Sequence, residues 1–263
     1  MAFSVAPVLR SAVNVEEVAE RLRMVGCVAA EEEACELVDS ARSPHELGDF
    51  LIRRSQGEPL AWITGRILFC GNWLYVAPGV YVPRFESQEL ARRAAAALAV
   101  TRGRAVDLCT GMGAVASVLI RAVPEAVVVG VELDRRAAAC GRRNGVPMVV
   151  ADLGEPLRTG ACDVVTAIAP YVPTDELEFL PADVQRYEPR LALDGGAKGL
   201  DLLQRVVPAA ARLLRRRGYL FTELGGDQDQ RLAPTLSQAG FEVVDTWCDE
   251  DGDLRGLAAQ LVR

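Results

Sequence analysis

The stretch Ala105-Val106-Asp107-Leu108-Cys109-Thr110-Gly111-Met112-Gly113-Ala114 decides the fold of this chain. Its first four residues are typical of a short buried strand, the two glycines predict a loop, and the apolar residues after them predict a helix running to about Val123. Gly111 and Gly113 can adopt backbone angles closed to other residues and let a ligand approach the main chain. The following helix would point its free N–H groups and the positive end of its dipole at that ligand.

A second apolar run supports a ligand at this loop. Residues 126–131 are apolar and end in Glu132, roughly 20 residues beyond the glycines. An acid at this position is placed to bind the hydroxyl groups of a ribose. The sequence therefore predicts a nucleoside-containing cofactor. Residues 111–116 also fit the dinucleotide fingerprint G-x-G-x-x-(G/A), so a dehydrogenase remains an alternative.

Two further acids favour S-adenosylmethionine (SAM) over a dinucleotide. Asp107 precedes the loop, where a carboxylate can accept from an ammonium group but would repel a pyrophosphate. Asp152 follows a predicted strand over 147–151, where it can accept from an adenine amine. This pattern resembles the signature of class I methyltransferases. The predicted cofactor-binding residues are Asp107, Cys109, Thr110, Gly111, Met112, Gly113, Ala114, Glu132, Leu133, Asp152, Leu153 and Ile168.

Composition narrows the class of protein further. The 263 residues, half of them hydrophobic and a quarter charged, suit one large globular domain or one with a small appendage. The net charge of −7 argues against a nucleic-acid partner, and no apolar run is long enough for a membrane span. Seven cysteines without a C-x-x-C pair, and no export signal, predict a cytoplasmic protein with reduced thiols. His45 is the single histidine, so no multi-histidine metal site is expected.

Strands and helices alternate regularly from residue 104 onward. Apolar strands alternating with helices predict an α/β fold with a parallel sheet covered on both faces, and ligands beyond the carboxyl ends of its strands. The last two strands are expected to pair antiparallel, giving a Rossmann-like sheet of seven strands that resembles the class I methyltransferase sheet. The predicted strands are 104–108, 126–132, 147–151, 162–168, 218–223, 241–247 and 256–262, and the helices are 113–123, 134–144, 199–216 and 227–239.

The first 86 residues predict two smaller parts. Residues 1–55 predict a bundle of three short helices with too little core to stand alone, either a packing cap or a module that docks a partner. Residues 56–86 predict a linker with a β-hairpin, whose strands 67–70 and 73–76 flank a Gly71-Asn72 turn. Residues 87–263, beginning with a helix over 87–100, form the predicted SAM-binding domain.

The linker carries a more specific resemblance. Its residues Gly57–Gly65 (GEPLAWITG) and Val80–Arg84 (VYVPR), together with Tyr187–Val207 (YEPRLALDGGAKGLDLLQRVV), resemble the HemK/PrmC family. The resemblance covers residues 57 to about 225. Members of this family are protein-(glutamine N5)-methyltransferases that act on the Gly-Gly-Gln tip of peptide-chain release factors. The resemblance implies SAM as cofactor and a release factor, or another protein or peptide, as methyl acceptor.

One motif departs from the family. The family's fourth strand ends in Asn-Pro-Pro-Tyr, where the Asn side-chain oxygen and a prolyl carbonyl hold the two N–H groups of the acceptor amide. This chain has Ile168-Ala169-Pro170-Tyr171 there, and these four are the predicted catalytic residues. Isoleucine cannot accept a hydrogen bond, and a buried amide N–H left unpaired costs roughly 1–3 kcal/mol. Lys198 also stands where the family places an acid, and the N-terminal bundle is short for a docking domain.

Three functions follow from this departure. The chain methylates glutamine poorly, with the Ala169 carbonyl compensating; or it uses SAM on a small molecule or modified peptide, or cleaves or cyclises SAM; or it binds SAM without catalysis. The replacement of Asn favours the hypothesis of a pocket rebuilt away from ordinary glutamine methylation. The predicted substrate-binding residues are Phe69 and Trp73 as walls of the acceptor site and Arg84 and Glu188 as its gate, although such residues also occur as simple core or surface pairs.

Overall fold

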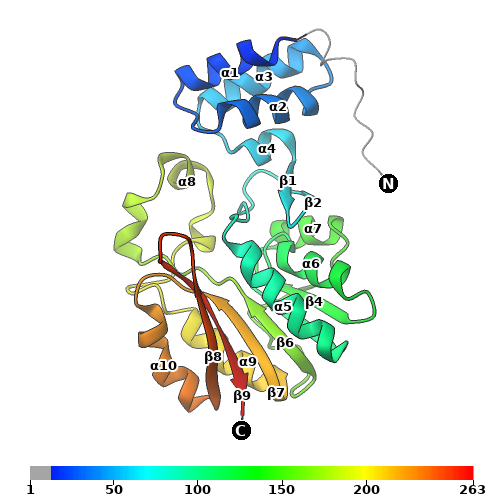
Figure 1. Ribbon diagram of the computed structural model, residues 1–263, viewed down its shortest axis with the longest axis vertical. Coiled ribbons are helices and arrows are strands. Elements are labelled where there is room, and N and C mark those ends of the chain that lie inside the picture. Colours follow the sequence, from blue (N-terminus) through cyan, green and yellow to red (C-terminus); the bar gives the residue numbers. More distant parts are fainter. Residues whose placement is uncertain (1–12, 263) are drawn as a thin grey trace.

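The computed structural model describes residues 13–262, so the first twelve residues of the predicted bundle lie outside the described residues. A seven-stranded sheet lies between two layers of helices, and the N-terminal helices sit beyond one end of it (Figure 1). The strand order β5-β4-β3-β6-β7-β9-β8 confirms the predicted sheet. The strands are β3 (Arg104–Leu108), β4 (Val127–Glu132), β5 (Met148–Val150), β6 (Cys162–Ala167), β7 (Leu214–Glu223), β8 (Phe241–Cys248) and β9 (Leu254–Leu261).

The direction of the strands fixes where a ligand can bind. β9 runs antiparallel to both of its neighbours, while the other strands pair in parallel. The chain leaves β3 toward one edge of the sheet through β4 and β5, and then returns to β6 on the other side of β3. Loops at such a reversal point diverge and leave a crevice at the carboxyl ends of the strands.

Each face of the sheet has its own hydrophobic core. On one face pack α5 (Ser87–Thr101), α6 (Ala114–Ala122) and α7 (Arg135–Arg143), with the linker beside them. On the other face pack α9 (Leu203–Leu213) and α10 (Gln228–Gln238). Both faces of β6 are therefore buried, and even its two polar residues, Asp163 and Thr166, lie inside.

The N-terminal helices have a third core. They are α1 (Val15–Met24), α2 (Ala30–Ser40) and α3 (Pro44–Ser55), and the side chains of Asn14 and Ser43 cap α1 and α3. Ile63 of α4 (Leu60–Thr64), a helix that the sequence did not predict, packs into this core. The core of the bundle therefore extends past residue 55 into the linker.

The hairpin of the linker is present, but its predicted turn is wrong. β1 (Arg66–Phe69) pairs with β2 (Asn72–Tyr75), and Phe69 faces Asn72 across the turn. The turn residues are therefore Cys70 and Gly71, with φ of 46° and 72°. A tight hairpin turn of this kind needs positive φ at both central residues. Asn72 stabilises it from outside, because its side-chain N–H donates to the Cys70 carbonyl at 3.0 Å.

The predicted helix over 199–216 is too long at both ends. α9 begins at Leu203 and ends at Leu213, and Leu214 already pairs with Cys162 as the first residue of β7. Leu213 is buried as the last residue of the helix, and Leu214 is buried as the first residue of the strand. The arginines at 215–217 follow as an exposed part of the strand.

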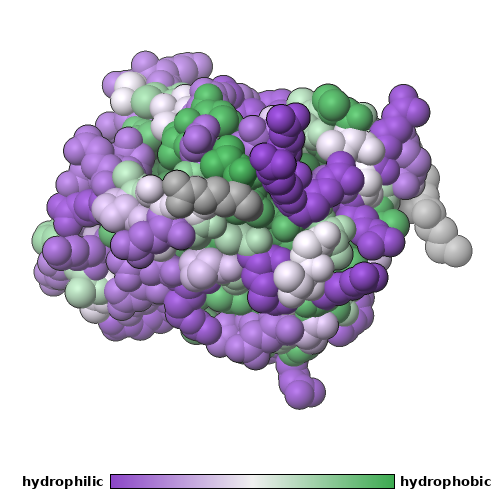
Figure 2. All heavy atoms as spheres, turned by 90° about the horizontal axis from the view of Figure 1, so that it is seen from below, coloured by the Kyte–Doolittle hydropathy of each residue, from purple (hydrophilic) through white to green (hydrophobic). Residues whose placement is uncertain are grey.

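None of the described helices is both long and apolar enough to cross a membrane. Figure 2 views the end of the molecule away from the N-terminal helices, and hydrophilic side chains cover most of it, with apolar ones showing between them.

Candidate active site

A cavity of about 550 Å³ lies at the carboxyl ends of the parallel strands. Loops after β3, β4, β5 and β6 form its walls, and residues from the linker and from the segment 180–193 close it. The volume lies in the usual range for small-molecule sites. The predicted residues that line it are Arg84, Cys109, Gly111, Glu132, Leu133, Asp152, Leu153, Ile168, Ala169, Pro170 and Tyr171.

Glu132 is held rigidly at the wall of this cavity. Its two carboxylate oxygens accept from the backbone N–H groups of Gly111 and Asp134, both at 2.8 Å. Burial raises the pKa of Glu132, while these backbone donors lower it. A carboxylate has further lone pairs, so it can still accept from ribose hydroxyls. Gly111 has a φ of +57°, and a Cβ there would meet no atom within 4 Å, which leaves its backbone open to a ligand.

Asp107 lies beneath the loop and outside the main cavity. The hydroxyls of Thr110 and Thr166 and the N–H of Ala116 donate to its two oxygens. Burial is the largest influence on its carboxyl and raises the pKa to about 6. Asp107 therefore has a structural role, because its hydrogen bonds connect the loop and the start of α6 to β6. It lines a smaller neighbouring cavity together with the predicted residues Phe69, Cys109, Thr110, Gly111, Met112, Ala114 and Ile168.

Three predicted residues line neither cavity, namely Gly113, Trp73 and Glu188. Gly113 packs against the next loop, where a Cβ would lie 2.8 Å from the Val146 side chain. Trp73 is half-exposed on the hairpin, and the Arg66 guanidinium covers its ring at 4.3 Å from the centroid. The structure therefore does not bring Trp73 to either cavity, whereas Phe69 is buried next to the smaller one.

Asp152 has a partner that the sequence did not reveal. Arg205 of α9 forms an ion pair with it at 2.6 Å, and both residues line the cavity. Both side chains remain about half exposed, so the pair adds little stability. One carboxylate oxygen accepts from Arg205, and the other can still accept from a donor on a ligand.

The loop 168–171 is fixed from behind by residues far away in sequence. The side-chain N–H group of Gln228 donates to the Tyr171 carbonyl at 2.8 Å, and Gly225 N–H donates to the Gln228 side-chain oxygen at 3.0 Å. A Cβ at Gly195 would lie 2.7 Å from the Pro170 carbonyl oxygen, and one at Gly199 would lie 2.0 Å from that of Tyr171. These two glycines therefore let residues 195–199 pack directly against the backbone of the loop.

Arg84 and Glu188 pair as predicted. The Arg84 guanidinium lies 2.7 Å from a Glu188 carboxylate oxygen and 5.0 Å from the centroid of the Tyr81 ring. Glu188 is buried, which raises the pKa of its carboxyl, while Arg84 lowers it. Arg84 itself lines the cavity, and Glu188 holds it in place from behind.

A strap over residues 173–193, for which the sequence predicts neither helix nor strand, covers the cavity. It contains η1 (Thr174–Phe179), α8 (Ala182–Tyr187) and η2 (Arg190–Ala192), each preceded by a proline. The prolines at 173, 181 and 189, regularly spaced, are the signal that could have predicted these turns. The strap adds apolar walls to the cavity through Leu180, Val184, Leu191 and Leu193.

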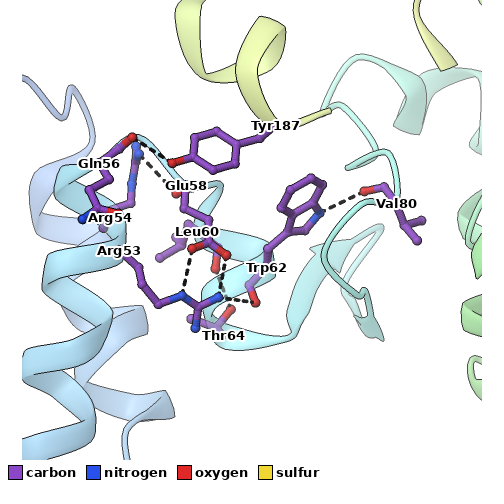
Figure 3. Close-up of polar contacts among 9 residues, drawn as sticks. All are labelled: Arg53, Arg54, Gln56, Glu58, Leu60, Trp62, Thr64, Val80 and Tyr187. Atoms are coloured by element: carbon purple, nitrogen blue, oxygen red, sulfur yellow. Dashed lines mark hydrogen bonds and ion pairs between the residues drawn. The ribbon is translucent and has the colours of Figure 1, made fainter. Parts of the chain in front are cut away.

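The linker ties this strap to the N-terminal helices (Figure 3). The Tyr187 hydroxyl donates to the Gln56 carbonyl at 3.0 Å, and the Tyr187 ring packs edge-on against Trp62 with centroids 6.2 Å apart. The Trp62 indole N–H in turn donates to the carbonyl of Val80, which lines the cavity, at 2.9 Å. The cavity wall at Val80 is therefore connected, through Trp62 and Tyr187, to the end of α3.

The seven-stranded sheet, with a cavity at the carboxyl ends of its parallel strands, defines a class I methyltransferase fold. The solved structure of a ribosomal protein L11 methylase from Lactobacillus delbrueckii subsp. bulgaricus has the same fold, with a TM-score of 0.52 at 13% identity over 72% of this chain and 84% of that chain. No protein-family model matches the sequence.

The sequence relatives show the family. The chain is 38% identical over 216 residues to a release factor glutamine methyltransferase of Geobacter sulfurreducens, covering 77% of this chain and 74% of that one. It is also 38% identical over 197 residues to a 4-amino-L-phenylalanine/4-methylamino-L-phenylalanine methyltransferase of Streptomyces pristinaespiralis, covering 70% of this chain and 67% of that one. The chain belongs to the release factor glutamine methyltransferase family, which confirms the predicted resemblance and the predicted enzyme class, a methyltransferase.

Proposed function

We propose that this protein is a SAM-dependent N-methyltransferase whose acceptor is a glutamine side chain of a release factor. The observation that carries the proposal is the convergence of two sets of residues on one cavity. Gly111, Glu132 and Asp152 come from the loops after β3, β4 and β5, and the loop 168–171 follows β6. A cofactor and an acceptor bound to these residues would therefore lie next to each other in the same cavity.

The residues on the cofactor side fit SAM. Glu132 holds the ribose hydroxyls, Asp152 and the backbone at Leu153 hold the adenine, and the open backbone at Gly111 accommodates the amino-acid part. When bound there, SAM supplies a methyl group on a positively charged sulfur.

The residues on the acceptor side work by positioning. The carbonyl of Ala169 accepts one N–H of the acceptor nitrogen, and Tyr171 and the strap enclose it, so that the nitrogen lone pair faces the methyl group. Holding two reactants in line supplies a large part of a barrier reduction without acid–base chemistry. The fixed backbone of the loop, tied by Gln228 and packed on two glycines, suits this role.

The N-terminal helices supply the contact with a protein acceptor. We assign residues 1–55 to a docking bundle, 56–86 to the linker and 87–263 to the catalytic domain, working in the cytoplasm as the cysteine usage predicts. The contacts of Tyr187 and Trp62 connect the bundle to the strap, so a release factor bound to the bundle would reach the cavity on its acceptor side.

A second acceptor is favoured by one observation, the Ile168 side chain at the cavity wall. Isoleucine and the apolar strap residues suit an aromatic amine better than a primary amide. The relative from Streptomyces pristinaespiralis is named for such an acceptor. A single experiment separates the candidates. The pure protein is incubated with SAM alone, with SAM and a release factor, and with SAM and 4-amino-L-phenylalanine, and every product is identified by mass spectrometry. Methylation of the release factor supports the first candidate, and methylation of the amine alone supports the second.

A further inference from the structure

Glu223, which has no part in the predicted site, lies beside Ile168 at the carboxyl edge of the sheet. β6 and β7 are parallel, and Ala167 pairs with Thr222, so the next residues on the two chains are Ile168 and Glu223. Side chains alternate between the two faces of a strand. Phe221 and Ile168 both contact the core under α5, and Glu223 follows Phe221 by two residues. Glu223 therefore points to the same face of the sheet as the residue that replaces Asn.

The carboxyl group of Glu223 is buried and incompletely satisfied. Glu223 is 5% exposed, and among residues 13–262 neither its Oε1 nor the nearby Ser87 hydroxyl has a hydrogen-bond partner of good geometry. Buried polar atoms without partners are rare and call for an explanation. Burial is the largest influence and raises the pKa of Glu223 to about 7, and the Glu86 charge adds to this. The hydroxyls of Ser87 and Tyr171 and the charge of Arg255 lower it.

Tyr171 connects this carboxyl group to the cavity. Its side chain lines the cavity, and a Cβ at Gly225 would lie 3.9 Å from its ring, so the ring packs against the chain just beyond Glu223. Burial, reinforced by the Glu223 charge, raises the pKa of Tyr171, and the phenol therefore keeps its proton. A phenol has a single proton to donate and oxygen lone pairs that accept. When an ionised carboxylate takes the proton, the lone pairs remain for another donor.

We propose that Glu223 is a positioning residue that turns the Tyr171 phenol so that its oxygen accepts an N–H of the methyl acceptor, in place of the Asn that Ile168 replaces. The inference rests on the proposed function and deepens it. The acceptor is then a nitrogen with two N–H groups, a primary amide or amine, with the Ala169 carbonyl taking one and Tyr171 the other. As the new N–C bond forms, the C–S bond breaks with its electrons going to sulfur, and the nitrogen releases one proton to solvent.

The arrangement depends on pH with a definite sign. Below about pH 7 Glu223 binds a proton and can donate it to the phenol oxygen, so that the phenol proton points into the cavity and opposes an N–H donor. Above this pH the carboxylate accepts from the phenol. Methylation of the acceptor should therefore rise as the pH increases through about 7. Tyr81 and Arg84 also lie near the Tyr171 phenol. Across that pH range Tyr81 stays neutral and Arg84 stays charged.

The test compares wild type, Glu223→Gln, Tyr171→Phe and the exposed control Glu242→Gln. Methyl transfer from labelled SAM to a release factor is measured to obtain kcat/KM between about pH 6 and 9. Calorimetry measures the affinity for S-adenosylhomocysteine. We expect Glu223→Gln to lower kcat/KM at pH 8 roughly 10- to 100-fold, the usual loss for a charged hydrogen bond, and to flatten the pH profile. The affinity for S-adenosylhomocysteine should stay within about twofold, and Glu242→Gln should match wild type. If Glu223→Gln lowers the affinity for S-adenosylhomocysteine together with kcat/KM, the role of Glu223 is structural and the proposal is overturned. An unchanged pH profile of kcat/KM would also overturn it.

A readout without turnover separates this inference from the proposed function. The carboxyl band of Glu223, identified by infrared difference against Glu223→Gln, should titrate near pH 7, and Tyr171→Phe should raise that pKa because a donor is lost. If wild type binds S-adenosylhomocysteine but methylates no release factor, the proposed function fails. The infrared titration still tests whether Glu223 and Tyr171 interact. An unchanged pKa of Glu223 in Tyr171→Phe would overturn the interaction, and a raised pKa would support it.

Discussion

Gln228 offers a direct test of how the loop 168–171 is held. It is 6% exposed, and its side chain makes two short hydrogen bonds, to the Tyr171 carbonyl at 2.8 Å and from Gly225 N–H at 3.0 Å. Replacement by leucine keeps the volume but removes both bonds and leaves their partners unpaired. Each net hydrogen bond contributes about 1 kcal/mol, and a buried unpaired group costs about 1–3 kcal/mol. We therefore expect Gln228→Leu to lower the free energy of unfolding by about 2–4 kcal/mol.

The assay is urea unfolding followed by tryptophan fluorescence, with Gln238→Leu as the matched control. Gln238 lies exposed on the same helix, so its replacement should change the free energy by less than about 0.5 kcal/mol. Methylation should fall further than the affinity for S-adenosylhomocysteine, because the loop faces the acceptor. Equal stability of Gln228→Leu and wild type would refute the view that this side chain anchors the loop.

Three more predictions concern the cofactor, the acceptor and the bundle. Glu132→Ala should weaken SAM binding by about 1–3 kcal/mol in calorimetry, because a charged acceptor is lost, and NAD should not bind to wild type at comparable strength. Because we propose that Tyr171 accepts the N–H that the family's Asn accepts, Ile168→Asn alone should change glutamine methylation little. In a Tyr171→Phe background it should raise methylation roughly 30- to 150-fold, if it recovers about 2–3 kcal/mol of alignment, and a double variant no faster than Tyr171→Phe would refute the shared role of the two positions. Deleting residues 1–55 should leave SAM affinity nearly unchanged in calorimetry and reduce methylation of the release factor. A folded truncated chain that cannot bind SAM would contradict the division into docking and catalytic parts.

Local sequence patterns correctly predicted those elements that depend mainly on residues close to one another in the sequence. The strand 104–108 and the loop after it carry their own information, since a buried strand, two glycines and a following helix lie within twenty residues. The linker strands were predicted for the same reason. The wrong turn at Gly71-Asn72 arose because Cys70 adopts a positive φ, which its residue type rarely favours.

The remaining features depend on contacts between distant segments. Arg205 reaches Asp152 only because α9 packs beside β6, and Glu223 lies next to Ile168 only through the register of β6 and β7. Gln228 looks like an ordinary first residue of a helix until its bonds to Tyr171 and Gly225 are seen. Trp73 is the converse case, because Arg66 covers its ring on the surface of the hairpin, away from the cavity. Such residues have no local signature that separates them from core or surface.

The most direct test of the central claim is the mass of the release factor peptide that carries Gly-Gly-Gln after incubation with SAM and the pure protein. We predict a gain of one methyl group on the glutamine side chain, absent when the glutamine is replaced by glutamate. An unmodified peptide in a reaction where the protein binds SAM and methylates an amine instead would contradict the claim.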